Sequence, residues 1–421
     1  MHPEKIVFRD FRIVDFAGDF FGSLVVENGR ITGVLTGHGG IPGASLVIDG
    51  GAFPETAVLM PAFIDLHAHF REPGFPEKET LESAALASVA GGFTTVVCMA
   101  NTSPVIDTLE KVLSLKSRSD ALALVDLYPV MSLTKNMQGV ELSGITELQN
   151  AAGKTPGLPL MLSEDGKDLA DDALFLAAMG EARRLGLPVS CHCDYGGAEG
   201  AAVSRAIGLG RKAGCHIHVA HVSTGETVNI IRRAKENISN GEDFAFTCEA
   251  TPHHIGATVD DAGRMGSGSF GRVNPPLATE ADRRAVVAAV LDGTIDAIAT
   301  DHAPHSPVDK AAGAPGFVGL ETAFAVCLAN LAGGGDLRRL SALTGANPAR
   351  ILGLPDRGRI AEGLRADLVI ADTGALWKVD AARFKSRGSC TPFDGRELRG
   401  KILMTINAGR IVFQGGGNEQ Y

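Results

Sequence analysis

The alternation of short apolar runs with helical stretches is the feature that most constrains the fold of this chain. Eight runs are apolar enough to be strands buried on both faces, as in a parallel sheet; they span 58–67, 94–99, 121–129, 158–162, 187–191, 215–222, 243–248 and 294–300. Amphipathic, Ala-rich stretches separate most of them, at 77–90, 168–185, 198–213, 226–236 and 280–291. This order predicts an α/β fold, a (β/α)8 barrel of the TIM type. A doubly wound open sheet is the alternative, but no GxGxxG motif follows an early strand.

Both ends of the chain are rich in short strands. Residues 24–34 read as a hairpin around Asn28-Gly29, and residues 402–413 as a second hairpin around Asn407-Ala408-Gly409. We expect residues 1–56 and 353–421 to meet in one small β-sandwich beside a barrel domain of residues 57–352. Two separate β appendages are the alternative, although neither end is large enough to bury a core alone.

Composition excludes several classes of protein. The net charge of −10 lacks the basic footprint of a nucleic-acid-binding protein, and one Trp and three Tyr leave few rings on which bases could stack. No run of about 18 apolar residues predicts a membrane span, and the charged N-terminal segment lacks an apolar signal core. Seven cysteines form no recognisable disulfide framework. We therefore expect a cytoplasmic protein with reduced cysteines, without contact to nucleic acid or membrane.

The first predicted strand ends in a pair of histidines. His67 and His69 are two residues apart, so both side chains point to the same face of the strand. A single histidine there would more often be a hydrogen-bonded core residue. Two imidazoles inside a barrel are costly unless a partner satisfies them, and imidazole is a good zinc ligand. The pair therefore favours a metal site.

Four further strands end in residues that bind metals. They are Asp165, His192, His221 and Asp301. An aspartate at a strand end is often only a helix cap. However, the strands of a barrel all end at one face, where catalytic groups gather. The six side chains together could hold two divalent ions, with a carboxylate bridging them.

Other nearby residues are given no ligand role. Cys191 and Cys193 alternate with the histidine between them and should pack as small apolar residues. His216 and His218 lie at odd spacing from the ligand of the sixth strand, so we expect them to face the helix layer or solvent. The histidines at 253–254 either support the site from behind or are loop residues.

Basic and amide side chains lie near the same strand ends. They are Arg71, Asn101, Asn274 and His305. An arginine fork recognises a carboxylate through two parallel hydrogen bonds. The alternatives are a surface salt bridge of Arg71 with a nearby glutamate, and turn chemistry of the asparagines beside proline.

Several motifs together resemble those of the dihydroorotases, in the bacterial type I branch of the amidohydrolase superfamily. The resemblance extends from about residue 5 to 413, and its motifs lie at 61–74, 91–102, 299–305, 319–322 and 363–369. It implies a metal-dependent barrel with a β-sandwich shared by both termini.

The resemblance also implies how zinc would be held. Two ions per chain are expected, and one is possible. His67 and His69 would bind one ion together with Asp301. His192 and His221 would bind the second, and Asp165 would bridge the two. No lysine lies in 158–165, where relatives carry a carbamylated lysine in place of the bridging aspartate.

The implied reaction is the reversible closure of N-carbamoyl-L-aspartate to L-dihydroorotate and water in pyrimidine biosynthesis. Asp301 would carry the proton. Arg71, Asn101 and His305 would hold the substrate carboxylate, and Asn274 the ring or carbamoyl group. Residues 306–316 would form a mobile loop that closes over the site.

The chain also departs from its relatives. The segment between His192 and His221 is shorter than in most of them, Glu164 stands before Asp165 where a second aspartate is common, and Ala278 stands where arginine is usual. Two other functions stay open: hydrolysis of a neutral cyclic amide at the same metals, and a scaffold role beside aspartate transcarbamoylase. A homo-oligomer is expected.

Overall fold

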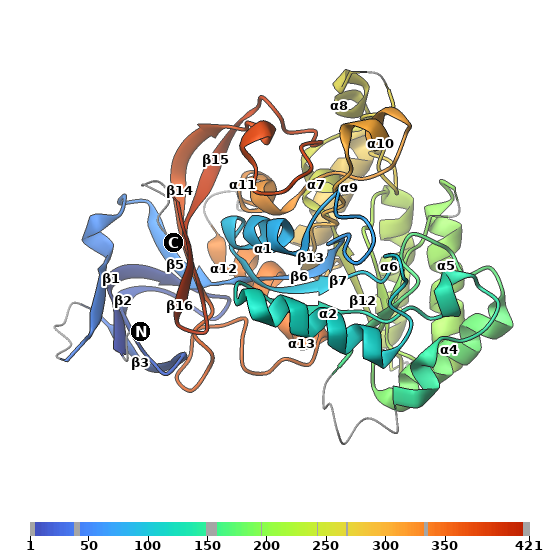
Figure 1. The fold of residues 1–421 in the computed structure, drawn as a ribbon, viewed down its shortest axis with the longest axis horizontal. Coiled ribbons are helices and arrows are strands. Elements are labelled where there is room, and N and C mark those ends of the chain that lie inside the picture. The colour runs from blue at the N-terminus through green and yellow to red at the C-terminus, as the bar shows by residue number, and fades with distance from the viewer. Residues whose placement is uncertain are drawn as a thin grey trace.

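A computed structural model describes residues 5–37, 43–148, 158–194, 196–241, 243–266, 268–331 and 336–415. The outermost residues of the expected terminal domain, 1–4 and 416–421, lie outside these ranges. Figure 1 shows a β-rich part that carries both chain ends, beside a larger part in which helices surround strands.

The larger part contains two parallel sheets in which each strand pairs with the next along the chain. Their orders are β6-β7-β8 and β9-β10-β11-β12-β13. Single parallel bridges, Met131 to Leu162 and Ala68 to His302, join the edges of the two sheets. The strands are β6 (Phe63–Ala68), β7 (Phe93–Cys98), β8 (Asp126–Pro129), β9 (Leu162–Ser163), β10 (Val189–Cys191), β11 (Ile217–Val219), β12 (Phe246–Ala250) and β13 (Ala297–Ile298).

Most of the observed strands are shorter than the predicted apolar runs, and two of the runs are interrupted. The run at 58–67 is two strands: β5 (Ala57–Pro61) belongs to the terminal sheet, and β6 begins at Phe63. Ala62 separates them, and its N–H donates to Asp367 O. In the run at 121–129, the first two residues end a helix and only Asp126–Pro129 is a strand. A continuous apolar run cannot reveal such a break, because buried helix and strand segments look alike in sequence.

Helices follow most of the parallel strands. Each of the five predicted helical stretches coincides largely with one of them, and side-chain oxygens of Thr80, Asp171 and Thr279 cap the first turns of three. The α-helices are α1 (Leu81–Ala90), α2 (Leu109–Leu122), α4 (Asp172–Leu185), α5 (Glu199–Ala213), α6 (Gly225–Ser239), α7 (Pro252–Gly256), α8 (Val259–Arg264), α9 (Glu280–Leu291), α10 (Pro307–Ala311), α11 (Ala323–Leu331), α12 (Leu337–Ser341) and α13 (Asn347–Ile351).

The two ends of the chain form one eight-stranded sheet. Its order is β16-β15-β14-β5-β1-β2-β3, with β4 paired to β1. The antiparallel pairing of β14 with β5 joins the two ends, so they are not separate appendages. The sheet encloses its own core, which includes Phe8, Phe11 and Leu368. The strands are β1 (Lys5–Val14), β2 (Asp19–Glu27), β3 (Arg30–Thr36), β4 (Leu46–Asp49), β14 (Leu368–Lys378), β15 (Glu397–Asn407) and β16 (Arg410–Gln414).

Both predicted hairpin turns are present, and their tips touch. Asn28 and Gly29 have φ values of 51° and 75°, and Ala408 and Gly409 have 48° and 75°. A Cβ on Gly29 would lie 2.7 Å from Ala408 O, so glycine is required there by contact as well as by backbone angle. Among the described residues, no helix combines the length and hydropathy that a membrane crossing needs.

Candidate functional site

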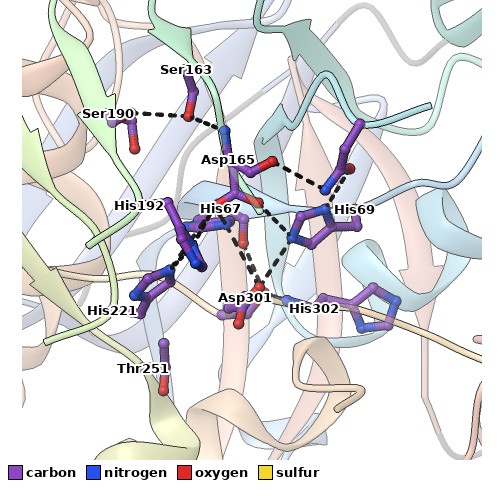
Figure 2. A network of polar contacts seen from close by, with 12 residues as sticks. His67, His69, Ser163, Asp165, Ser190, His192, His221, Thr251, Asp301 and His302 are labelled. Atoms are coloured by element: carbon purple, nitrogen blue, oxygen red, sulfur yellow. Dashed lines mark hydrogen bonds and ion pairs between the residues drawn. The ribbon is translucent and has the colours of Figure 1, made fainter. Parts of the chain in front are cut away.

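The six predicted metal ligands lie together at the carboxyl ends of the parallel strands (Figure 2). His67 lies in β6, and the other five follow β6, β9, β10, β11 and β13 within a few residues; they are His69, Asp165, His192, His221 and Asp301. All except the half-buried His192 are buried. Neighbouring parallel strands end side by side, which brings together residues from across the sequence.

Asp165 lies at the centre of this cluster. Its Oδ1 is 3.2 Å from His67 Nε2, 3.4 Å from His192 Nδ1 and 3.9 Å from His221 Nε2. Its Oδ2 is 3.4 Å from His69 Nε2. One carboxylate therefore faces all four imidazoles, which is the arrangement that a bridging ligand requires.

Asp301 approaches the cluster from the opposite side. Its Oδ1 is 3.1 Å from His69 Nε2 and 3.6 Å from His67 Nε2. The ligand atoms of His67, His69 and Asp301 all lie within 4.8 Å of one another, and so do those of His67, Asp165 and His221. His67 thus contributes to both groups. His192 adjoins the second group, because its Nδ1 is 3.0 Å from His221 Nε2.

Three buried atoms in the cluster have no hydrogen-bond partner, namely His67 Nε2, Asp165 Oδ1 and His221 Nδ1. Leaving such atoms unpaired is costly unless something else satisfies them. The surrounding nitrogen and carboxylate oxygen atoms are the ligands that zinc prefers. The residues therefore fit one or two divalent transition-metal ions.

The electrostatics of the cluster also favour bound cations. Burial opposes ionisation of Asp165 and Asp301, but the neighbouring histidines outweigh it and lower the pKa of both carboxyls below the usual range. Burial likewise opposes a charge on His67, but Asp165 and Glu249 raise its pKa well above the usual value. Burial lowers the pKa of His221 to about 3, and His192 reinforces the effect. The buried carboxylates thus demand positive charge at this point.

Three residues of the site have left-handed backbone angles, with φ of 61° at Arg71, 37° at His221 and 44° at Asp301. Such angles are strained for residues with a side chain and persist only where neighbours impose them. Asp65 is one such neighbour, because its carboxylate accepts hydrogen bonds from the N–H and hydroxyl of Thr300. Asp65 was not among the predicted site residues, although it shares the strand face of His67 and His69.

The expectation that His218 faces the helix layer or solvent is wrong. Its side chain is fully buried, and its Nε2 is 2.9 Å from Glu249 Oε2. Glu249 Oε1 is in turn 3.0 Å from His67 Nδ1. Strand β11 ends at Val219 and the backbone turns at His221, so the alternation of side chains along a strand does not continue to His221. His216 is half-buried and bonds to Thr247, inside the same strand layer.

Glu249 is a second supporting residue for which no role was predicted. It lies within β12 rather than after it, and it is fully buried. Burial opposes its ionisation, but hydrogen bonds from His218 and His67 lower its pKa to about 2. A glutamate among buried strand residues could have signalled this role, since a buried carboxylate needs partners.

Asn101 touches a predicted ligand. Its Oδ1 is 2.9 Å from His69 Nδ1, which leaves Nε2 of that histidine to face the cluster. Its Nδ2 lies 3.5 Å from Asp165 O. Turn chemistry alone therefore does not account for Asn101.

Arg71 is buried at the edge of the cluster. Its Nε donates to Pro304 O, and its Nη2 is 3.1 Å from His305 Nε2. The surface salt bridge that the sequence allowed is not formed with Glu72, which pairs with Arg118 instead. Burial together with the nearby charge of Arg71 lowers the pKa of His305 to about 3, so this imidazole is neutral.

A small cavity of about 200 Å³ lies over the cluster. Its lining combines the predicted metal ligands, His67 excepted, with all four predicted substrate residues: Arg71, Asn101, Asn274 and His305. Pro315 and Gly316, at the end of the predicted loop, close one side. Drug-sized ligands need roughly 300–1,000 Å³, so this cavity suits a smaller molecule.

Five other residues near the site contact the protein core, the backbone or one another rather than facing the metal ligands. Cys191 and Cys193 are buried in the apolar core, as predicted. His253 and His254 lie in α7 rather than in a loop, and His254 Nε2 donates to Pro275 O beside the cavity. Glu164 points away from the metal ligands and accepts the N–H groups of 133–134.

The similarity of the sequence to known proteins is consistent with a metal site. The sequence model of the amidohydrolase family matches residues 58–412. The chain therefore belongs to the amidohydrolase family, whose members are metal-dependent hydrolases.

Curated relatives that are similar to this chain over most of its length are dihydroorotases. One from Clostridium botulinum is 36% identical over 97% of this chain and its own whole length. One from Anaeromyxobacter dehalogenans is 39% identical over 93% of this chain and 98% of its own. Within the family, the chain therefore groups with the dihydroorotases. Among solved structures, an L-hydantoinase from Arthrobacter aurescens superposes with a TM-score of 0.86 at 25% identity, over 99% of this chain and 97% of its own.

Proposed function

We propose that this enzyme closes N-carbamoyl-L-aspartate to L-dihydroorotate and water, reversibly, as a zinc-dependent dihydroorotase of pyrimidine biosynthesis. The observation that carries the proposal is Arg71: its buried guanidinium lines the same 200 Å³ cavity as the metal-ligand cluster. A substrate that is both a cyclic amide and a carboxylate matches that pairing. The relatives named dihydroorotase support it independently.

The proposal includes the finer architecture. We infer that the two parallel sheets close into one (β/α)8 barrel, which the two bridges between their edges support. Residues 57–352 would form this barrel, and 1–56 with 353–421 the β-sandwich, although β5 contributes residues 57–61 to the terminal sheet.

The proposal also assigns the metal ligands. His67, His69 and Asp301 would hold one zinc ion, His192 and His221 the second, and Asp165 would bridge them. Bound zinc would polarise the reacting carbonyl and lower the pKa of a water from 15.7 to about 7.

The protein's own residues would orient the substrate and move its proton. Arg71, with Asn101 and His305, would hold the substrate carboxylate, and Asn274 the ring or carbamoyl group. In the hydrolytic direction Asp301 takes a proton from the attacking water and delivers it to the leaving ring nitrogen. In ring closure the same carboxylate works in reverse. Holding the carboxylate fixes the distance between the reacting atoms. Bringing these atoms together accounts for a large part of the activation free energy, so this positioning would lower the barrier.

Hydrolysis of a neutral ring is the second candidate, favoured by the similarity to the L-hydantoinase. A neutral ring has no use for the buried Arg71, which argues for dihydroorotate. A cytoplasmic location, a homo-oligomer and association with aspartate transcarbamoylase remain proposals that rest on the sequence alone.

The test is turnover of the purified, zinc-loaded protein on L-dihydroorotate, dihydrouracil, hydantoin and allantoin, with zinc content measured on the same sample. Selective turnover of dihydroorotate is expected. Turnover of a neutral ring would overturn the assignment of Arg71 and leave the metal ligands standing. A zinc-loaded protein that turns over none of the four would point to the scaffold role.

A further inference from the structure

A chain of hydrogen bonds leads from the metal ligand His67 into the interior of the strand layer. His67 Nδ1 is 3.0 Å from Glu249 Oε1, and Glu249 Oε2 is 2.9 Å from His218 Nε2. His218 Nδ1 is 2.9 Å from Thr247 Oγ1, which is 2.9 Å from His216 Nε2. His218 lies on β11, Thr247 and Glu249 lie on β12, and His216 directly precedes β11. The two strands are paired in parallel, with His218 opposite Thr247.

The chain permits one consistent assignment of protons. The carboxylate of Glu249 lies between two imidazole nitrogens and accepts from both, so His67 donates through Nδ1–H and His218 through Nε2–H. With Nε2 as its donor, His218 accepts at Nδ1, and the hydroxyl of Thr247 is the donor that faces it. The hydroxyl oxygen accepts in turn from His216. Each bond thus fixes the tautomer of the next ring.

All the inner members are buried. His218 and Glu249 have no exposed surface, and Thr247 is 5% exposed. In such surroundings an unpaired donor or acceptor is costly, so the loss of one member leaves its neighbours in the chain without a partner. At the outer end, half-buried His216 lines a groove of about 790 Å³ together with Lys235 and Arg350, at the amino ends of these strands.

We propose that Glu249, His218 and Thr247 form a positioning chain that holds His67 with Nδ1 protonated and Nε2 bare toward the metal. The chain sets the affinity of the site for zinc, and none of its members touches the substrate cavity. The proposal rests on the metal site of the proposed function. A ligand histidine whose far nitrogen donates to a carboxylate is more basic and better oriented, and loss of such a partner costs about 10–100-fold in affinity.

The test is the dissociation constant for zinc, measured by competition with a chelator at neutral pH. His218→Leu removes the donor to Glu249, whereas His218→Gln keeps an N–H at the same reach. Thr247→Val removes only the hydroxyl, whereas Thr247→Ser keeps it. We expect zinc affinity to fall about tenfold or more in His218→Leu and by a smaller factor in Thr247→Val. In His218→Gln and Thr247→Ser, zinc affinity should return towards that of wild type.

Two controls make the result decisive. Circular dichroism and Tm of the zinc-free proteins establish folding, and if His218→Leu does not fold, the Thr247 pair alone decides. Wild-type zinc affinity in folded His218→Leu and Thr247→Val would overturn the proposal. It would also be overturned if His218→Gln and Thr247→Ser bound zinc as weakly as His218→Leu and Thr247→Val, because altered packing alone would then explain the loss. A wild-type protein that binds zinc but does not turn over dihydroorotate would instead overturn the proposed function.

Discussion

At the scale of the single residue, the position of Asp301 is compatible with both of its proposed roles, metal ligand and proton carrier. It faces His67 and His69, as a metal ligand would, and it lines the cavity, where it can reach substrate. Its lowered pKa keeps its carboxylate ionised. Asp165, by contrast, faces all four imidazoles and is better placed to hold metal than to move protons.

Replacing Asp301 with Asn should therefore separate turnover from metal binding. We expect kcat on dihydroorotate to fall by about 10²–10⁴, the usual contribution of general acid–base catalysis, with zinc retained. Asp165→Asn is the matched control and should lose zinc as well as activity. Near-normal kcat in Asp301→Asn, with zinc bound, would remove the proton-transfer role.

Arg71 should govern substrate affinity. Arg71→Met removes a charged, bidentate partner of a carboxylate, so we expect KM for dihydroorotate to rise about 10–100-fold and kcat to change less. Arg118→Met, at an exposed arginine outside the cavity, is the control. An unchanged KM in Arg71→Met would contradict the carboxylate assignment.

At the scale of elements, the segment over the cavity is held by one lysine. Lys310 lies in α10 and is almost fully buried, and its Nζ donates to Arg272 O, Ala314 O and Gly316 O, each at 2.9 Å. Gly316 lines the cavity. The loop predicted at 306–316 thus contains a short helix and a buried lysine that is hydrogen-bonded to three carbonyls. Its movement stays a prediction.

Lys310→Met keeps the apolar stem and removes the charged donor. We expect amide hydrogen exchange across residues 306–316 to become at least about tenfold faster and KM to rise, because three carbonyls lose their donor. Val308→Ala, at an exposed side chain of the same helix, is the control. Equal exchange rates in wild type and Lys310→Met would show that Lys310 does not hold the segment.

A second element, the connection between β14 and β15, is anchored by Glu321. Its carboxylate accepts the N–H groups of Lys385 and Ser386. Burial raises its pKa to about 7, from an ordinary value of 4.5. Because the folded protein binds this proton more tightly than the unfolded chain, the stability that Glu321 contributes is present below pH 4.5 and is lost as the pH rises through about 7.

Glu321→Gln should remove this pH dependence. The amide oxygen can still accept both N–H groups, while no charge is buried at high pH. We expect Tm of wild type to fall below that of the variant as the pH is raised from about 4.5 to 8. A Tm difference that stays constant over this range would contradict the shifted pKa.

At the scale of the whole molecule, charged side chains join the terminal sheet to the parallel strands. Arg357 is 7% exposed and donates to Thr95 Oγ1 at 3.0 Å and to Asp126 Oδ2 at 2.8 Å. Asp126 also pairs with Arg365, next to β14. This network lies at the amino ends of β7 and β8, away from the cavity.

Arg357→Met should weaken the molecule without affecting the site. Removing one partner of a buried ion pair leaves the other unpaired, so we expect the free energy of unfolding to fall by about 3 kcal/mol. The kcat/KM of the folded variant should equal that of wild type. Arg359→Met, at an exposed position nearby, is the control for denaturant unfolding. A loss of stability no larger than in this control would contradict a role for Arg357 at the junction.

The sequence by itself determined the identity of the strands and of the cluster. Apolar runs, hairpin turns and ligand-type residues at strand ends are local patterns, and the parallel order of a βα chain then brings the strand ends together. His67, His69, Asp165, His192, His221 and Asp301 could thus be chosen before their distances were known.

Only the tertiary structure decided what lies behind those residues. The break between β5 and β6, the inward side chain of His218 and the partners of Glu249 all depend on where the backbone bends and which strands become neighbours. The alternation of side chains along a strand is a local rule, and it fails where a strand ends. The left-handed angles at Arg71, His221 and Asp301 are imposed by contacts between distant segments, so no local pattern could predict them.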